Sequence, residues 1–351
     1  MNALLTFKPE QRAEAFRVAE QELGLPAHVL EKDFWVTYLL DALFQQLELP
    51  VGMMFKGGTS LSKCYGVIER FSEDIDLALD RDDLGFDGGN APELQPSSTK
   101  ARGKLKALQS AGTQYVADLL YPALHAYLES ELEEKFSITI DEKIPDNILF
   151  FYPRCLDEAD YGDSNYVKPV VLIETGTKAA HEPVDDIRIT PLITQAESII
   201  AAIPSMAEDN TTVRTLRIER TFWEKVTFLH QQNSRNEPEK VKDRLSRHLY
   251  DIAMIANSEH GNDCLGALEL LQEVAYHKSV YFKQGGVNYI DAGAGALRLA
   301  LTPELEPAFR KDYGRMDEMF YGAPPAFDDI VAELERIENL VNRALSKSSE
   351  H

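Results

Sequence analysis

The stretch "KGGTSLSKCYGVIERFSEDIDLAL", residues 56–79, constrains the fold of this chain more than any other. The apolar run "MMF" before it indicates a short strand, which the two glycines stop. A helix beginning at Thr59 or Ser60 is predicted next, because both are good helix-capping residue types. "DIDLAL" then alternates polar and apolar side chains, as strands do. The sequence therefore predicts a strand, a glycine turn, a helix and a second strand in quick succession.

Two aspartates spaced by one residue lie on the second predicted strand. Asp74 and Asp76 point to the same face of that strand, while Ile75 and Leu77 point into the packing behind it. Two carboxylates on one face repel each other unless a cation lies between them. Oxygen ligands suit Mg²⁺ or Mn²⁺, and substrate phosphates usually complete a magnesium shell. The pair therefore indicates a metal site that would be shared with a phosphate-bearing substrate.

The glycine pair indicates the other half of such a site. Without Cβ atoms, the backbone at Gly57 and Gly58 can approach a ligand closely. Free amides at the start of the following helix, together with the hydroxyls of Thr59 and Ser60, favour an anion there. Either motif alone is more typical of an ordinary turn or of a solvated strand edge. The two in this order favour a nucleoside triphosphate site.

The rest of the chain predicts an α+β protein with a helical C-terminal part. A long loop, rich in Asp, Gly and Pro, is expected over residues 80–99 and a helix over residues 100–135. The expected domains are an N-terminal helical lead (1–50), an α/β core (51–218) and an α-helical C-terminal domain (219–351). Further strands are predicted at 136–142, 148–152, 167–176 and 211–220.

The order of these motifs resembles the polymerase-β-type nucleotidyltransferase fold. More closely, "FKGGTSLSKCYGVIERFSEDIDL" resembles the AbiEii/AbiGii family of bacterial nucleotidyltransferase toxins, in which a GGT-x-L-x-K stretch runs into an RFSEDIDL-like one. "EKDFWVTYLL" looks like the N-terminal helix of that family. The resemblance covers residues 25–80 closely and residues 215–256 more loosely. It implies a mixed sheet flanked by helices and the transfer of a nucleotide from an NTP.

The resemblance also assigns residues outside the first motif. "RTFWEKVTFLHQQ" looks like the family's helix with a functional lysine, which falls on Lys225, and "RHLYDIAMI" places the family's catalytic aspartate at Asp251. Arg247, one turn earlier, would orient that carboxylate. His248 departs from the family, which usually has an aspartate there. Lys63, in the GGT-x-L-x-K stretch, is expected to bind nucleotide; an unaided helix lysine such as Lys225 is otherwise more often solvated.

A third metal-binding carboxylate is expected from a neighbouring strand, as in polymerase-β-type folds. Glu174 in "VVLIETG" is the first candidate and Asp141 in "SITIDE" the second. Either residue could instead be a surface group at the end of a strand.

The acceptor of the nucleotide is the least constrained part of the prediction. The formal net charge of −22 disfavours general attraction to nucleic acid, so RNA would need a local basic patch. The candidate RNA-binding residues lie in two stretches, 99–106 and 235–247: Lys100, Arg102, Lys104, Lys106, Arg244 and Arg247. The resemblance implies transfer to a tRNA 3′ end. The first alternative function is nucleotidylation of a protein hydroxyl. The second is that of a non-catalytic partner-binding protein with a degenerate site.

The resemblance further implies a toxin–antitoxin or abortive-infection role in phage defence, with an antitoxin that carries a winged-helix domain. No apolar run is long enough to span a membrane, and the N-terminus reaches charges too soon for a signal peptide. The three cysteines, Cys64, Cys155 and Cys264, are expected to be free thiols in a reducing cytoplasm.

Overall fold

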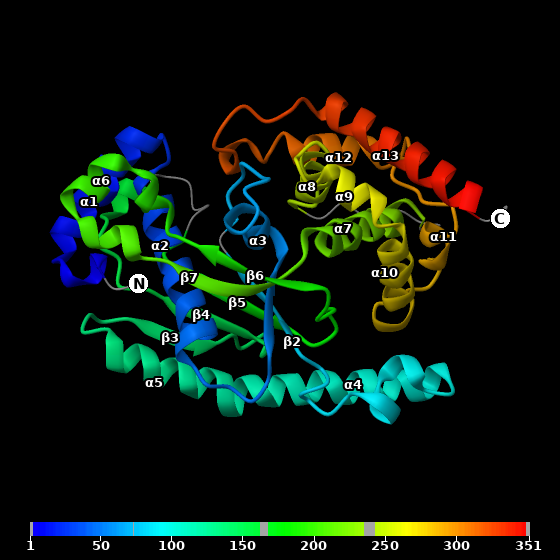
Figure 1. The fold of residues 1–351 in the computed structure, drawn as a ribbon, viewed down its shortest axis with the longest axis horizontal. Coiled ribbons are helices and arrows are strands. Elements are labelled where there is room, and N and C mark those ends of the chain that lie inside the picture. The colour runs from blue at the N-terminus through cyan, green and yellow to red at the C-terminus, as the bar shows by residue number, and fades with distance from the viewer. Residues whose placement is uncertain (1–2, 73, 162–167, 235–242, 349–351) are drawn as a thin grey trace. The chain divides into compact units, whose positions relative to one another are not determined.

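The computed structural model describes residues 3–72, 74–161, 168–234 and 243–348 (Figure 1). The chain forms two compact units, and it passes between them more than once. The first unit consists of Met1–Cys64, Phe71–Asp87 and Lys106–Thr215. The second unit consists of Tyr65–Arg70, Gly88–Leu105 and Leu216–His351.

The first unit is built on a seven-stranded mixed sheet with the strand order β3-β4-β5-β2-β1-β7-β6. β2 is antiparallel to β1 and parallel to β5, whereas β7 runs parallel to β1. The predicted mixed sheet is therefore confirmed. The strands are β1 (Met53–Lys56), β2 (Ile75–Leu79), β3 (Ser137–Ile140), β4 (Asn147–Phe151), β5 (Val171–Gly176), β6 (Val184–Ile189) and β7 (Thr211–Leu216).

The central strands of the sheet show why this sequence forms it. In β2, Ile75, Leu77 and Leu79 are fully buried, while Asp76 is only half-buried. The edge strand β6 carries Asp185 and Asp186 instead of an apolar face. Charges on an edge strand discourage pairing with another chain. The period-2 pattern that the sequence shows in β2 is weak in β6, which is why β6 was not predicted.

Helices cover the sheet of the first unit. α2 (Ala27–Asp41) is buried on nearly every side and packs against the sheet. Its Trp35 stacks on Tyr152 with ring centroids 5.7 Å apart and meets Phe150 edge-on at 5.8 Å. α5 lies along β3 (Figure 1). The helices of this unit are α1 (Pro9–Leu23), α2, α3 (Gly57–Lys63), α5 (Tyr121–Glu131), α6 (Glu197–Ala202) and the C-terminal part of α4 (Ser98–Tyr115).

The second unit is helical in the part of the chain that the structure describes, as expected for the C-terminal region. α7 packs against α8, α9 and α10, and the long amphipathic α13 packs against α8. The helices of this unit, besides the start of α4, are α7 (Ile218–Asn233), α8 (Arg247–Ala256), α9 (Gly261–Gly266), α10 (Leu268–Tyr281), α11 (Ile290–Gly293), α12 (Glu306–Tyr313) and α13 (Phe327–Ser348).

Three local predictions differ from the structure. α3 begins at Gly57 rather than at Thr59 or Ser60, and it ends at Lys63, so residues 65–70 are not helical. The helix expected over 100–135 is two helices, α4 and α5, joined by a wider turn at Val116–Leu120. The segment 80–99 contains short 3₁₀ turns in place of a plain loop. The N-terminal helices lie in the same compact unit as the sheet, and the domain bounds expected from the sequence stay a prediction.

Candidate active site

A row of polar residues crosses four adjacent strands of the sheet. Lys56 on β1 lies opposite Asp76 on β2, Asp76 lies opposite Glu174 on β5, and Glu174 lies opposite Asn147 on β4. Side chains in register on neighbouring strands share one face. The Asn147 side-chain amide donates to Glu174 Oε1 at 3.5 Å. The structure therefore brings Asp76 and Glu174 together, and it adds Lys56 and Asn147, which the sequence patterns did not single out.

Gly57 is required by the position of Asp76. The backbone of Gly57 has φ +84°, a conformation that disfavours any side chain. A Cβ atom built on Gly57 would lie 2.0 Å from Asp76 Oδ2 and 2.8 Å from its Cγ. The glycine turn and the second aspartate of the DxD motif are therefore two parts of one arrangement. Gly57 leaves room for the Asp76 carboxylate, which explains why the two motifs occur together.

Asp76 and Asp74 place negative charge beside the Glu174 carboxyl. Burial, and then the negative charges of Asp76 and Asp74, raise the pKa of the Glu174 carboxyl to about 7, against a smaller opposing effect of Lys56. Neighbouring carboxylates keep this carboxyl partly protonated near pH 7. A bound cation would favour its ionised form. The donor set, made of oxygens alone, fits Mg²⁺ or Mn²⁺.

Asp141, the second candidate for the third carboxylate, has a different role. It follows β3 at the edge of the sheet, with β4 and β5 between β3 and β2. Neighbouring strands lie about 4.8 Å apart, so β3 and β2 are separated by about 14 Å. The Asp141 carboxylate instead accepts the backbone amides of Lys143 and Ile144 and closes a turn. The register favours Glu174.

The hydroxyls expected to face a phosphate are used inside the protein. Thr59 Oγ1 donates to the carbonyl oxygen of Asp74 at 2.6 Å, and Ser60 Oγ donates to the carbonyl oxygen of Gly57 at 3.0 Å. Both residues are fully buried. Their hydroxyls hold the turn and the strand in place, so the backbone of Gly57 and Gly58 is the part of the motif suited to meet a phosphate.

Lys63 is likewise held by the protein. Its Nζ lies 2.5 Å from Asp33 Oδ1, and the Lys63 side chain is only 4% exposed. Asp33 also accepts the backbone amide of Leu192 at 2.7 Å. In this structure Lys63 ties α3 to α2, and its predicted contact with nucleotide remains a prediction.

The second unit holds a different charged cluster, centred on Asp251. Arg70 binds both carboxylate oxygens of Asp251, Nε to Oδ1 and Nη2 to Oδ2, each at 2.7 Å. Lys225 Nζ lies 2.8 Å from Oδ2. The Asp251 side chain is fully buried, that of Arg70 is 2% exposed and that of Lys225 is 10% exposed. Burial alone would raise the pKa of Asp251, but Arg70 and Lys225 together hold it well below its usual range.

This arrangement corrects two expectations about the helical motifs. Arg70, rather than Arg247, orients Asp251; Arg247 is exposed at the start of α8. Lys225 is not a free surface lysine, because it is ion-paired and almost buried. Arg70 lies within the "RFSEDIDL" stretch, so the sequence offered a signal for it, but its partner lies 181 residues away in the chain.

His248 lies against the same cluster. Its ring packs on Phe228 with centroids 4.6 Å apart, and its Nδ1 atom is buried without a hydrogen-bond partner among the described residues. Burial, and then the positive charges of Lys225 and Arg247, lower its pKa well below the usual value. The imidazole is therefore neutral at physiological pH.

The candidate RNA-binding residues that the structure describes are mostly exposed. The side chains of Lys100, Arg102 and Lys106 are exposed on α4, while Lys104 donates to Asn90 Oδ1 at 2.7 Å. Arg244 and Arg247 are exposed as well. Residues 235–242 of the second basic stretch lie outside the described residues.

Two negative expectations can be compared with the structure. The three cysteines are free, and burial raises the pKa of the Cys64 and Cys264 thiols to about 12, which makes them poor nucleophiles. Among the described residues, no helix combines the length and the apolar character needed to cross a bilayer.

Comparison with known proteins agrees with this description. The family described as "Nucleotidyl transferase AbiEii toxin, Type IV TA system" matches residues 38–333. Among solved structures, the chain is similar to MenT4, a nucleotidyltransferase toxin from Mycobacterium tuberculosis, with a TM-score of 0.52 and 15% sequence identity over 94% of this chain and 89% of that one. A comparison with curated proteins found no match.

Proposed function

The chain belongs to the AbiEii family of nucleotidyltransferase toxins of type IV toxin–antitoxin systems, and we propose that it transfers a nucleoside monophosphate from an NTP to the 3′ end of tRNA. The observation that supports this proposal is the carboxylate row of the first unit, in which Asp76 lies in register with Glu174 and the charges of Asp76 and Asp74 raise the pKa of Glu174. A nucleotidyl transfer site needs such a concentration of negative charge only if it binds cations.

Asp74, Asp76 and Glu174 are the residues that would hold the metal. Their oxygens and the raised pKa of Glu174 fit a divalent cation, as argued above. When bound there, Mg²⁺ or Mn²⁺ would lower the pKa of an acceptor hydroxyl and neutralise charge on the triphosphate. Lys56 lies opposite Asp76 in the sheet, and its positive charge would reduce the excess negative charge of the row before substrate binds.

The backbone at Gly57 and Gly58 would receive the β- and γ-phosphates. This assignment rests on the backbone amides at the start of α3 and on the Thr59 and Ser60 hydroxyls, whose hydrogen bonds fix the turn. We assign Lys63 the task of positioning α3 through Asp33.

The Asp251 cluster would supply positive charge. Arg70 and Lys225 carry two positive charges against the single negative charge of Asp251, and His248 is neutral. Arg70 holds Asp251 at two points, and Asp251 holds the Lys225 ammonium. A lysine fixed in this way is suited to neutralise charge on the transferred phosphoryl group or on the leaving pyrophosphate.

RNA is the acceptor that the surface charges favour. Lys100, Arg102 and Lys106 are exposed on one helix, in a stretch from Thr99 to Lys106 that contains no acidic residue. Polyanion binding depends on neutralising phosphates at the contact, so a local patch can act despite a net charge of −22. We further propose that the toxin is cytoplasmic and is inhibited by an antitoxin with a winged-helix domain.

The experiment that tests the proposal is labelling with each of the four α-³²P NTPs in the presence of Mg²⁺ and cell lysate. Label is expected in the tRNA band and at the 3′ end after nuclease digestion. The same reaction with purified tRNA should release pyrophosphate. Label found only in protein bands would replace tRNA by a protein hydroxyl, and the absence of pyrophosphate release with any acceptor would leave only a partner-binding role.

A matched pair of variants tests the basic patch. The triple variant Lys100→Gln, Arg102→Gln, Lys106→Gln should weaken tRNA binding and reduce the slope of log K against log salt by about 2–3, because each lost phosphate contact contributes about 0.7–0.9. The control Lys283→Gln, Lys311→Gln, Lys347→Gln removes the same charge from exposed positions elsewhere. Equal effects of the two variants on tRNA affinity would remove the patch from the proposal.

A further inference from the structure

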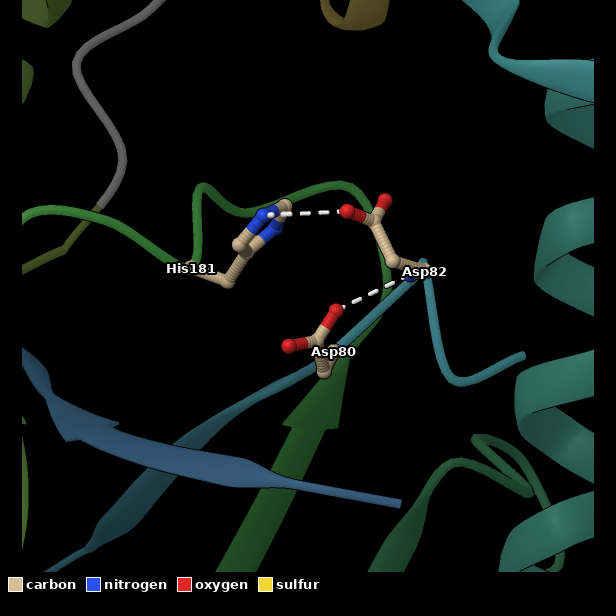
Figure 2. Close-up of side chains that lie close together, drawn as sticks. All are labelled: Asp80, Asp82 and His181. Carbon is tan, nitrogen blue, oxygen red and sulfur yellow. Dashed lines mark hydrogen bonds and ion pairs between the residues drawn. The ribbon is translucent and has the colours of Figure 1, made fainter. Parts of the chain in front are cut away.

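A second group of metal-ligating side chains lies at the opposite end of β2 from Asp76. Asp80 follows the last residue of β2, Asp82 lies in the turn after it, and His181 comes from the segment between β5 and β6. One ligand atom from each of the three lies within 4.8 Å of the others. Figure 2 shows the three side chains around one small space. Asp80 is four residues from Asp76, or about 13 Å along the strand, so this group is separate from the carboxylate row.

The His181 imidazole is not used by the rest of the described protein. Its Nε2 lies 3.8 Å from Asp82 Oδ2, which is too long for a hydrogen bond. Its Nδ1 is buried and has no hydrogen-bond partner among the described residues. The His181 side chain is 16% exposed. Because Nε2 makes no good hydrogen bond to Asp82, its lone pair is available to a metal ion.

The distance between His181 and Asp82 is close to what one metal ion requires. Two ligand atoms on a tetrahedral zinc ion lie about 3.3–3.6 Å apart, given metal–ligand distances of about 2.0–2.2 Å. The observed 3.8 Å between Nε2 and Oδ2 would need to shorten by only a few tenths of an ångström. Asp80 is already positioned, because its Oδ1 accepts the backbone amide of Asp82 at 2.9 Å.

We propose that Asp80, Asp82 and His181 form a second metal site, which binds a zinc-type divalent cation and fastens the segment between β5 and β6 to the end of β2. One imidazole nitrogen with two carboxylate oxygens suits Zn²⁺, whereas Mg²⁺ and Ca²⁺ prefer oxygen ligands alone. Three protein ligands leave a fourth position for water. The site does not depend on the nucleotidyl transfer proposed above, because none of its residues belongs to the carboxylate row.

The test is a calorimetric titration of the full chain with Zn²⁺ in an Asp74→Asn, Asp76→Asn background, which removes the other carboxylates. One Zn²⁺ per chain is expected, and zinc should raise the melting temperature. Adding His181→Ala should abolish this binding, and adding Asp82→Asn should weaken it at least tenfold. The control is His125→Ala, which removes a partly exposed histidine that pairs with Glu129.

Two results would overturn the site: no saturable Zn²⁺ binding in the background protein, or binding unchanged by both His181→Ala and Asp82→Asn. Because Asp82 is half exposed, Asp82→Asn keeps the test valid even if His181→Ala does not fold. Pyrophosphate release by the otherwise unaltered chain carrying Asp82→Asn should be retained. Its loss together with zinc binding would contradict the separation of the two sites.

Discussion

The two charged clusters of this protein are opposite in kind. In the carboxylate row, burial and two neighbouring carboxylates raise the pKa of Glu174 to about 7. In the Asp251 cluster, one carboxylate is held by two cations, and its pKa lies well below the usual range. In the first cluster neighbouring negative charges oppose the ionisation of Glu174, whereas in the second two cations favour the ionisation of Asp251. On the proposed function, a metal ion and substrate would complete the first cluster, so the two clusters make opposite predictions for mutation.

The largest expected effect is on catalysis, from a substitution in the carboxylate row. Asp76→Asn should lower the rate of pyrophosphate release by about 10⁴-fold, or about 5.5 kcal/mol of transition-state stabilisation. Its stability should not fall, because the substitution removes a repulsion. The control is Asp186→Asn on the exposed edge strand β6 of the same sheet. Near-normal release in Asp76→Asn would remove the row from the reaction.

The next largest effect is on stability, from a substitution in the Asp251 cluster. Asp251→Asn removes the buried negative charge that Arg70 and Lys225 share, and it should lower the free energy of unfolding by about 3–5 kcal/mol in urea titrations. The control, Asp328→Asn, breaks an exposed pair with Arg310 and should cost less than about 1 kcal/mol. Equal costs for the two variants would mean that Asp251 is not a buried, compensated charge.

The same cluster predicts a sensitivity to acid. Because the folded-state pKa of Asp251 is depressed, its contribution to stability is present above the ordinary pKa of about 4 and is lost as pH falls below it. Asp251→Asn should remove the loss of stability that Asp251 causes at low pH. Urea titrations over about pH 3–6 would measure this change in the free energy of unfolding. An unchanged acid profile would contradict the assignment.

A smaller effect is expected at the glycine turn. Gly57→Ala places a methyl group against the Asp76 carboxylate in a left-handed backbone conformation, so a loss of about 1–3 kcal/mol is expected. Gly85→Ala is the control, since Gly85 also has positive φ but has open space at its Cβ position. If both variants lose the same stability, backbone strain alone accounts for it and the contact with Asp76 adds nothing.

The smallest effect concerns Glu174. Its raised pKa means that the folded protein keeps a proton that the unfolded chain releases above about pH 4.5, so stability falls as pH rises towards about 7. Glu174→Gln should therefore stabilise the metal-free protein at pH 8, by about 1–2 kcal/mol after allowing for its partial exposure, and have little effect at pH 4. Thermal unfolding at the two pH values measures this. A stabilisation that is equal at both would contradict the charge argument.

Local patterns in the sequence pointed to part of the first cluster but to little of the second. The alternation in "DIDLAL" placed Asp74 and Asp76 on one face, and the buried run before Glu174 identified a strand. The register that sets Glu174 rather than Asp141 beside Asp76 depends on the strand order, which periodicity does not encode. The bond between Arg70 and Asp251 joins residues 181 positions apart, so neither helix spacing nor composition revealed it. His181 belongs to no motif and became visible only through its neighbours.

The most direct test of the central claim is a Mn²⁺ titration followed by electron paramagnetic resonance, with an NTP present and with His181→Ala silencing the second metal site. The account predicts saturable Mn²⁺ binding in this protein and its loss when Asp74→Asn and Asp76→Asn are added, with folding unchanged by circular dichroism. Mn²⁺ binding of the same affinity after both substitutions would contradict the claim that the carboxylate row is the incomplete half of a nucleotidyl transfer site.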